Sequence, residues 1–265
     1  MKKSFFNLSA FLFVLPVVAH EFWLQPDQFI YKKNDVASIS FLVGENFEGE
    51  NWSGNRSKIK SLQFYNWKTK TDISKLLPDT TGASLLLPLK TEGTMVVTFN
   101  SNNSFIALDA AKFNGYLRED GLTNALAYRL QHHETDSGSR EFYQRSAKTI
   151  FQVGKPTDNT FYRETGLPLD IIPLQNPYSL KMNDTLTVKI LFQKRPLANY
   201  KIRLWYKEKD AAINTDLLSD EKGLIKFPII LKGKWMVSAV KMEPIINNPK
   251  ANWQSYWGSC TWGYK

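Results

Sequence analysis

Hydrophobic and polar residues alternate through much of the chain between residues 21 and 108. Ile39, Phe41 and Val43 alternate with Ser38, Ser40 and Leu42, for example. Further runs of this kind are at 59–67, 94–99 and 105–108. Successive side chains of a β-strand point to opposite faces, so the alternation predicts strands with one buried face. Because turn-forming residues separate the runs, the first half is predicted to be a β-sandwich.

The period of the pattern changes between residues 109 and 134. Leu122, Leu126 and Leu130 are spaced by four, as are Phe113 and Leu117. This is the spacing of one face of an α-helix. A preceding aspartate, Asp109, can cap the first turn. The segment is therefore predicted to form two short amphipathic helices laid against the sandwich.

Alternation returns in the second half of the chain. Leu186, Val188, Ile190 and Phe192 share one face, and further strand-like runs are at 202–206, 224–227, 234–242 and 253–262. Asp220–Gly223 is predicted to form a hairpin turn. Residues 154–159 have linker composition. The predicted fold class is mainly β, with two β-sandwich domains at 20–154 and 160–265, the second immunoglobulin-like, and short helices inserted in the first.

The first 19 residues have the three parts of a secretory signal peptide. Lys2 and Lys3 form the positive end, an apolar stretch runs from 5 to 18, and Val17-Val18-Ala19 fits a peptidase site. Cleavage after Ala19 would make His20 the first residue of a periplasmic protein. The apolar stretch is short for a permanent membrane span, and no later segment is predicted to be transmembrane.

Charge and motifs exclude some classes of function. The chain has 34 Lys and Arg against 25 Asp and Glu, for a net charge of +9, and the basic residues are scattered. Scattered charge predicts a solvated basic surface and disfavours nucleic-acid binding. The single cysteine, Cys260, is predicted to be a small buried residue. No catalytic triad, phosphate loop or close carboxylate pair is recognisable, so the protein is not predicted to be an enzyme.

The candidate chemistry is metal binding. A free N-terminal His20 offers its α-amine and its imidazole to one metal ion. The chain contains three histidines, and His132 and His133 follow the second predicted helix. His20 with one of these two would give three nitrogen donors, which suits copper(II) or nickel(II), and Glu21 could add an oxygen. The alternative is that all three are unrelated surface histidines.

Two other groups of residues allow a functional and a structural interpretation. Basic side chains could form an anion or chelate pocket, or an ion-pair network that ties helices to the sandwich, which is favoured. They are Arg118, Arg140, Arg145, Lys148 and Arg163. Four tryptophans could form a sugar-stacking platform, or pack in the core, which is favoured. They are Trp235, Trp253, Trp257 and Trp262, of which Trp253 and Trp257 have the same parity and Trp262 the opposite one.

Several segments resemble one family of exported proteins. They are His20–Leu24 with Pro26, Phe113–Leu122, Tyr143–Lys148, Gly166–Leu169, Lys234–Trp235 with Ala239–Met242, and Trp253–Trp257. On these segments the chain resembles the nickel-uptake-associated (NikM-like) proteins of unknown function. The resemblance implies a periplasmic accessory protein for uptake of nickel or cobalt, with His20 at the family's N-terminal histidine. It also implies an envelope partner, either an outer-membrane receptor or an inner-membrane transporter.

The expected function is therefore that of a periplasmic protein that binds nickel, cobalt or copper and assists uptake or handling of the metal. Two alternatives stay open. One is a copper-dependent oxidase of the polysaccharide type, which also uses an N-terminal histidine. The other is a metal-free carbohydrate-binding or scaffolding module, which would need the tryptophans to be exposed.

Overall fold

The computed structural model describes residues 21–264, and their strands form one ten-stranded sheet and two four-stranded sheets. The first outer sheet contains β1 (Glu21–Pro26), β3 (Val36–Glu45), β4 (Glu48–Asn51) and β7 (Leu85–Pro88). The second outer sheet contains β11 (Leu169–Pro173), β12 (Thr185–Phe192), β13 (Arg195–Pro196) and β16 (Leu224–Pro228). The predicted mainly-β fold class is confirmed.

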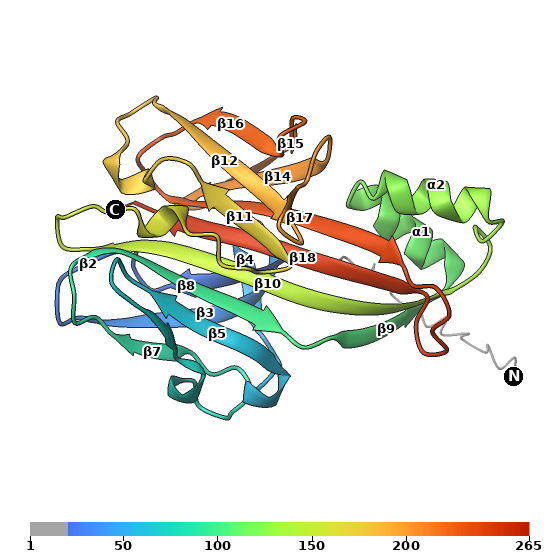
Figure 1. Cartoon of the computed structure of the whole chain (residues 1–265), viewed down its shortest axis with the longest axis horizontal. Coiled ribbons are helices and arrows are strands. Elements are labelled where there is room, and N and C mark those ends of the chain that lie inside the picture. Colours follow the sequence, from blue (N-terminus) through green and yellow to red (C-terminus); the bar gives the residue numbers. More distant parts are fainter. Residues whose placement is uncertain (1–20, 265) are drawn as a thin grey trace, which may run out of the picture.

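The larger sheet, called the central sheet here, lies between the two outer sheets (Figure 1). Its strands, in spatial order, are β15 (Ala211–Leu218), β14 (Lys201–Glu208), β17 (Lys234–Pro244), β18 (Trp253–Gly263), β10 (Ser139–Val153), β8 (Gly93–Ser101), β5 (Ile59–Tyr65) and β6 (Lys70–Asp72). Two short strands, β2 (Ile30–Tyr31) and β9 (Ser104–Leu108), also pair with β10. Short 3-10 turns lie at Arg56–Lys58, Ser74–Leu76, Thr160–Tyr162 and Pro177–Ser179.

Strand alternation in the central sheet supplies two cores on opposite faces. On β10, Ala147 and Phe151 pack in a core whose members all lie between 22 and 153, whereas Ile150 packs in the core under the second outer sheet. On β18, the Thr261 hydroxyl donates to the Leu24 carbonyl of β1 at 2.8 Å, while Trp262 packs in the second core. Each core therefore lies between the central sheet and one outer sheet.

The predicted boundary at 154–160 follows β10 and separates most residues of the first core from those of the second. The central sheet nevertheless continues across it, because β10 of the first half pairs in parallel with β18 of the second, from Glu141–Trp253 to Thr149–Thr261. The two-domain division and the immunoglobulin likeness of the second half stay predictions.

The two predicted helices are present as α1 (Ala110–Glu119) and α2 (Thr123–Gln131). Phe113 and Leu117 of α1 are buried with Met242 and Trp253 of β17 and β18. The helices thus lie beside one end of the central sheet (Figure 1). Although the first half of the chain supplies them, they pack on strands of the second half. No helix in the described part of the chain has the length and apolarity that a membrane span needs.

One local prediction is wrong. Asp220–Gly223 turns the chain but forms no hairpin, because β15 before it belongs to the central sheet and β16 after it pairs with β12. The pairing partner of a strand cannot be read from the sequence of that strand.

The cap of α1 gives a first testable prediction. The Asp109 carboxylate accepts a hydrogen bond from the Lys112 amide at 2.8 Å, as expected of an N-cap residue. Asp109→Ala removes this acceptor, so hydrogen exchange of the first-turn amides is expected to become about fivefold faster. Asp109→Asn keeps a capping oxygen and should exchange at nearly the wild-type rate. Equal rates in the two variants would contradict the capping role.

Candidate functional site

The described part of the chain begins at the place where the sequence predicts the metal site. His20 lies outside the described residues. Glu21 is the first residue of β1, pairs with Gly44 of β3, and is 5% exposed. Its Oε1 accepts a hydrogen bond from Ser238 Oγ of β17 at 2.9 Å. The same Oγ accepts a hydrogen bond from Trp205 Nε1 at 2.8 Å, so these bonds hold Glu21 of the first outer sheet against β14 and β17 of the central sheet.

A second buried carboxylate, that of Asp120, lines a small cavity together with Glu21. Asp120 follows the last turn of α1, and its side chain is 8% exposed. Its Oδ1 is 3.9 Å from Arg203 Nη1, which is long for an ion pair. Its buried Oδ2 has no hydrogen-bond partner among the described residues. An unpaired carboxylate oxygen in a buried position is costly unless something else satisfies it.

Two cations line this cavity as well, but other groups already hold them. Lys201 Nζ is 2.8 Å from Asp216 Oδ2, and Arg203 Nε is 2.9 Å from Asp216 Oδ1. Both side chains also donate to the Glu119 carbonyl at the end of α1, at 3.1 and 3.3 Å. Glu21, Asp120 and Asp216 thus share two cations, which leaves an excess of negative charge when all three are ionised.

Burial and this charge imbalance change the acidity of the carboxyls. Burial, followed by repulsion from Asp120, raises the pKa of Glu21 to about 7. Burial likewise raises the pKa of Asp120 to about 7, although Arg203 and Lys201 act against it. A nearby buried carboxyl, Glu141, also has its pKa raised to about 7, chiefly by burial. At Glu21 and Asp120, burial thus opposes ionisation more strongly than the nearby cations favour it.

The cavity between the carboxylates is small, with a volume of about 10 Å³. This is close to the minimum that holds one water molecule. It is lined by Glu21, Asp120, Lys201, Arg203, Ser238, Ala239 and Val240. The site can accept a water molecule or a single ion, but it has no room for an organic substrate.

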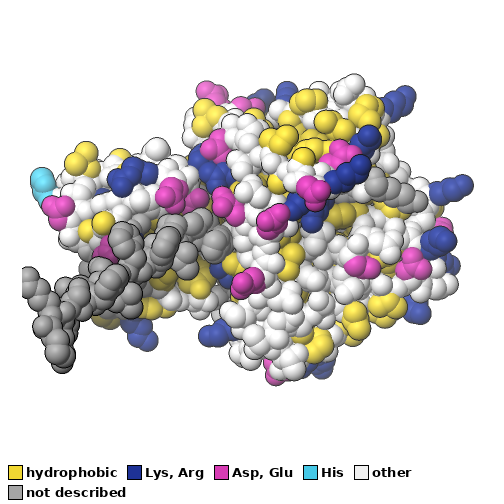
Figure 2. Space-filling model, turned by 180° about the vertical axis from the view of Figure 1, so that it is seen from behind, with side chains coloured by type: hydrophobic (Ala, Val, Ile, Leu, Met, Phe, Trp, Pro, Cys, Tyr) yellow, Lys and Arg dark blue, Asp and Glu magenta, His cyan; other side chains and the backbone are white. Residues whose placement is uncertain are grey.

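The structure does not bring His132 and His133 to this site. Both are exposed at the far end of α2, and the His132 ring stacks on Tyr128 with centroids 3.9 Å apart. Tyr128 in turn contacts Trp253, which pairs with Pro244 of β17. From Ser238 to Pro244 the strand extends about 20 Å. Figure 2 accordingly shows the histidine surface at the outer end of the helical part.

No three His, Cys, Asp or Glu side chains within residues 21–264 gather closely enough to hold a metal ion by themselves. Glu21 is the one predicted ligand in this range that lies at a buried polar site. Sequence reasoning missed Asp120, Ser238 and Arg203. Asp120 does lie inside one of the segments that carry the family resemblance, but no spacing rule connects it with Glu21.

The four tryptophans are buried, and two of the basic residues, Lys148 and Arg145, pack against other side chains of the protein. Each of the four tryptophan side chains is at most 8% exposed, so they form no exposed platform. Cys260 is buried as predicted, and burial raises its pKa to about 12. Of the five basic residues, Lys148 forms a buried ion pair, with Asp170 of β11, at 2.5 Å. Arg145 lies over the rings of Phe22 and Tyr143 instead.

No curated protein sequence matches this chain. Among solved structures it is similar to the crystal structure of trypsin-activated alpha-2-macroglobulin from Escherichia coli, with 8% identity and a TM-score of 0.21. That match covers 94% of this chain but 16% of the other, and so low a TM-score indicates neither a common fold nor a common function. Residues 17–243 match the family described as Domain of unknown function (DUF4198). The chain therefore belongs to the DUF4198 family.

Proposed function

We propose that this protein binds one transition-metal ion, nickel, cobalt or copper, at the amino end of β1, and that it assists uptake or handling of the metal in the periplasm. His20 would supply its α-amine and imidazole once the leader is removed. Glu21 and Asp120 would supply carboxylate oxygens. The expected N-terminal site is thus kept, but Asp120 takes the place of His132 or His133 as the further ligand.

The observation that carries the proposal is the unbalanced pair of buried carboxylates. Glu21 and Asp120 line a cavity that has room for about one water molecule, and the buried Oδ2 of Asp120 has no partner among the described residues. A bound cation would satisfy that oxygen and would favour the ionised form of both carboxyls, whose pKa values burial raises. Two carboxylates alone make a poor site for a transition metal, whereas added nitrogen donors from His20 suit nickel and copper.

The periplasmic role rests on the sequence. The first 19 residues have the organisation of a cleavable leader, and cleavage after Ala19 creates the N-terminal amine that the site requires. The resemblance to nickel-uptake-associated (NikM-like) proteins favours a role in metal uptake and an envelope receptor or transporter as partner. The carbohydrate-binding alternative loses its support, because the tryptophans it needs are buried.

Calorimetric titration with Cu²⁺, Ni²⁺, Co²⁺ and Zn²⁺ tests the proposal on protein that begins at His20. A protein whose α-amine is blocked by N-terminal acetylation keeps the imidazole but loses the amine as a donor. It is expected to bind at least tenfold more weakly, because the amine and the imidazole can no longer chelate the metal together. Electron paramagnetic resonance of the Cu²⁺ complex should show at least two nitrogen donors in the first protein.

Two variants of the proposed ligands and one control variant test the role of the carboxylates. Glu21→Gln and Asp120→Asn are each expected to weaken binding about tenfold. Glu141→Gln changes a buried carboxyl that does not line the cavity, so it should leave the affinity unchanged. Equal binding by the two N-terminal forms would overturn the role of His20. Equal losses in all three carboxyl variants would overturn the site. Finding a first residue other than His20 in protein from the native envelope would overturn both.

A further inference from the structure

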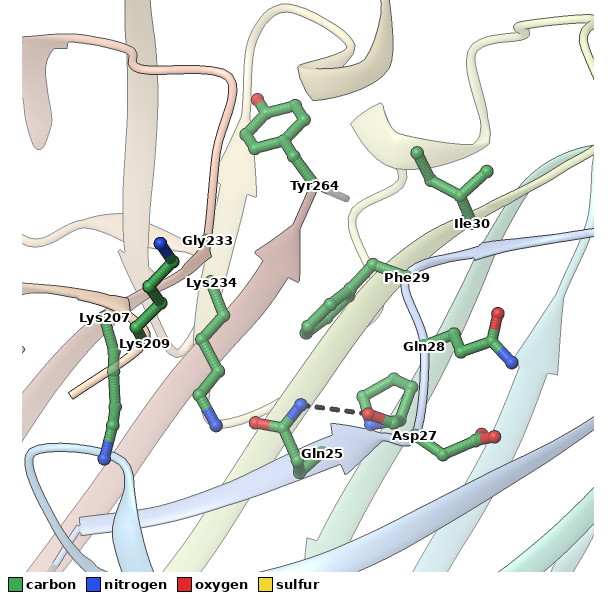
Figure 3. A pocket seen from close by; sticks show the side chains of 11 residues that line it. Gln25, Asp27, Gln28, Phe29, Ile30, Lys207, Lys209, Gly233, Lys234 and Tyr264 are labelled. Carbon is green, nitrogen blue, oxygen red and sulfur yellow. Dashed lines mark hydrogen bonds between the residues drawn. The ribbon is translucent and has the colours of Figure 1, made fainter.

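A larger cavity lies near the other end of β1, and the proposed metal site does not use it. Its volume is about 450 Å³, within the range of small-molecule sites. Figure 3 shows that β1 and the segment after it form one wall, while lysines from β14 and β17 face them across the cavity. The lining residues are Gln25 to Ile30, Lys207, Lys209, Gly233, Lys234 and Tyr264. Gln25 is four residues from Glu21, or about 13 Å along the strand.

Positive charge exceeds negative charge in this cavity. Lys207 is 14% exposed, and its ammonium is 3.0 Å from Oε1 of Glu48, a side chain that is 79% exposed. The half-buried Lys234 has no carboxylate within ion-pair distance in the described chain, and its ammonium lies 5.1 Å from the Phe47 ring centroid. Burial, with repulsion from Lys207, lowers the pKa of Lys234. Two neighbouring ammonium groups thus share one exposed carboxylate.

Asp27, the acid among the residues that line the cavity, cannot correct this imbalance at short range. Asp27 Oδ1 already accepts hydrogen bonds from the Tyr31 hydroxyl at 2.7 Å and the Ser38 amide at 2.8 Å. In Figure 3 the Asp27 carboxylate points away from the lysines, while the ammonium groups of Lys207 and Lys234 both extend toward the side of Gln25. A third lysine, Lys209, adds positive charge at the rim.

The cavity also contains an unsatisfied acceptor and an apolar wall. Gln25 Nε2 donates to the Pro26 carbonyl at 2.9 Å, but the buried Oε1 has no hydrogen-bond partner within residues 21–264. This oxygen can accept from a hydroxyl or amine of a ligand. Phe29 is 8% exposed and offers an apolar surface opposite the lysines. Such a combination of a few polar groups with an apolar wall is typical of small-molecule sites.

We propose that this cavity binds a small free organic anion, with Lys234 and Lys207 on its carboxylate or phosphate group, Gln25 on a donor group, and Phe29 against its apolar part. The excess of positive charge in the cavity favours an anion, and the cavity volume fits a small molecule. An exposed headgroup on a lipid surface carries similar chemistry, so the test must separate the two sources.

Titration with citrate and with inorganic phosphate, at constant ionic strength, tests the site by calorimetry and by amide chemical shifts. Binding is expected to weaken at least tenfold in Lys234→Gln. Lys226→Gln makes the same change of charge on β16, outside the cavity, and should weaken binding less than twofold. Gln25→Glu places a second carboxylate beside the lysines and should abolish binding. Because the pKa of Lys234 is already lowered, a neutral glutamine there should not unfold the protein, which circular dichroism checks.

Several results would overturn the proposal. One is that neither probe binds at millimolar concentration. Another is that Lys234→Gln and Lys226→Gln weaken binding equally, because the attraction would then come from the net charge of the protein. A third is that phosphatidylglycerol vesicles bind while citrate and phosphate do not, because the site would then serve a membrane surface. None of these outcomes bears on metal binding at Glu21 and Asp120, so the two proposals can fail separately.

Discussion

Replacing Lys148 by methionine is expected to lower the free energy of unfolding by about 3–5 kcal/mol. Lys148 lies on β10, and its ammonium is 2.5 Å from Asp170 Oδ1 of β11, with the two side chains 1% and 3% exposed. The ammonium also donates to the Ile171 carbonyl at 2.9 Å. Methionine fills a similar volume, so its main effect is to leave the Asp170 carboxylate buried without a counter-charge. Urea denaturation at pH 7 measures the loss.

Two further variants show whether the buried charge is the cause. Lys189→Met removes a more exposed pair, with Glu164 at 3.7 Å, and should cost less than about 1 kcal/mol. Adding Asp170→Asn to Lys148→Met should restore part of the stability, because asparagine carries no charge. In the wild-type structure Asp170 Oδ2 accepts a hydrogen bond from the Thr165 amide at 2.6 Å, and the amide oxygen of asparagine can still accept it. If Lys148→Met costs no more than Lys189→Met, or if the second change adds to the loss, the argument from the buried charge is wrong.

The same ion pair shows what the sequence could and could not predict about Lys148. Lys148 lies near the apolar residues Ala147 and Ile150 in the sequence, which favours burial, and a buried lysine needs a partner. The favoured ion-pair interpretation therefore holds for this residue. The partner could not be named, because Asp170 lies in a different sheet and no local spacing connects the two. The predicted link was between helices and sandwich, whereas the observed pair links the central sheet to the second outer sheet.

Elements with a strong local pattern were predicted well. The runs at 234–242 and 253–262 correspond to β17 (Lys234–Pro244) and β18 (Trp253–Gly263). The parity of the tryptophans also holds, since Trp253 and Trp257 pack with α1, whereas Trp262 packs in the core under the second outer sheet. In each case the period of the side chains alone decides which face of the strand is buried.

The features that define the site depend on contacts between distant parts of the chain. Glu21 and Asp120 line one cavity because β1 crosses the central sheet beside the end of α1, and no periodicity encodes that crossing. The parallel pairing of β10 with β18 is likewise invisible in either strand. Sequence reasoning therefore identified Glu21 through its neighbour His20, but it chose His132 and His133 as further ligands because histidine is a good ligand. Residue type alone favoured His132 and His133, which are exposed at the end of α2 that lies away from this cavity.

Stability is expected to fall as the pH rises from 5 to 8, and Glu141 should account for about 1–3 kcal/mol of that fall. Glu141 is 2% exposed on β10 beneath α1. Its Oε1 accepts hydrogen bonds from the Ser255 and Tyr116 hydroxyls, while its Oε2 has no partner in the described chain. Burial raises its pKa from 4.5 to about 7. Between these values the folded protein keeps a proton that the unfolded chain releases, so a rise in pH favours unfolding.

Glu141→Gln isolates this contribution, because glutamine is neutral at every pH in the range. The variant should match the wild type at pH 5 and be more stable than it by about 1–3 kcal/mol at pH 8. Glu21 and Asp120 produce a pH dependence of the same sign, since their pKa values are also raised, but they do so in both proteins and leave the difference unchanged. Glu221→Gln, in an exposed turn, should change stability at neither pH. Urea denaturation at both pH values decides the matter: an equal effect of Glu141→Gln at pH 5 and pH 8 would mean that packing, and not the buried charge, controls stability at this position.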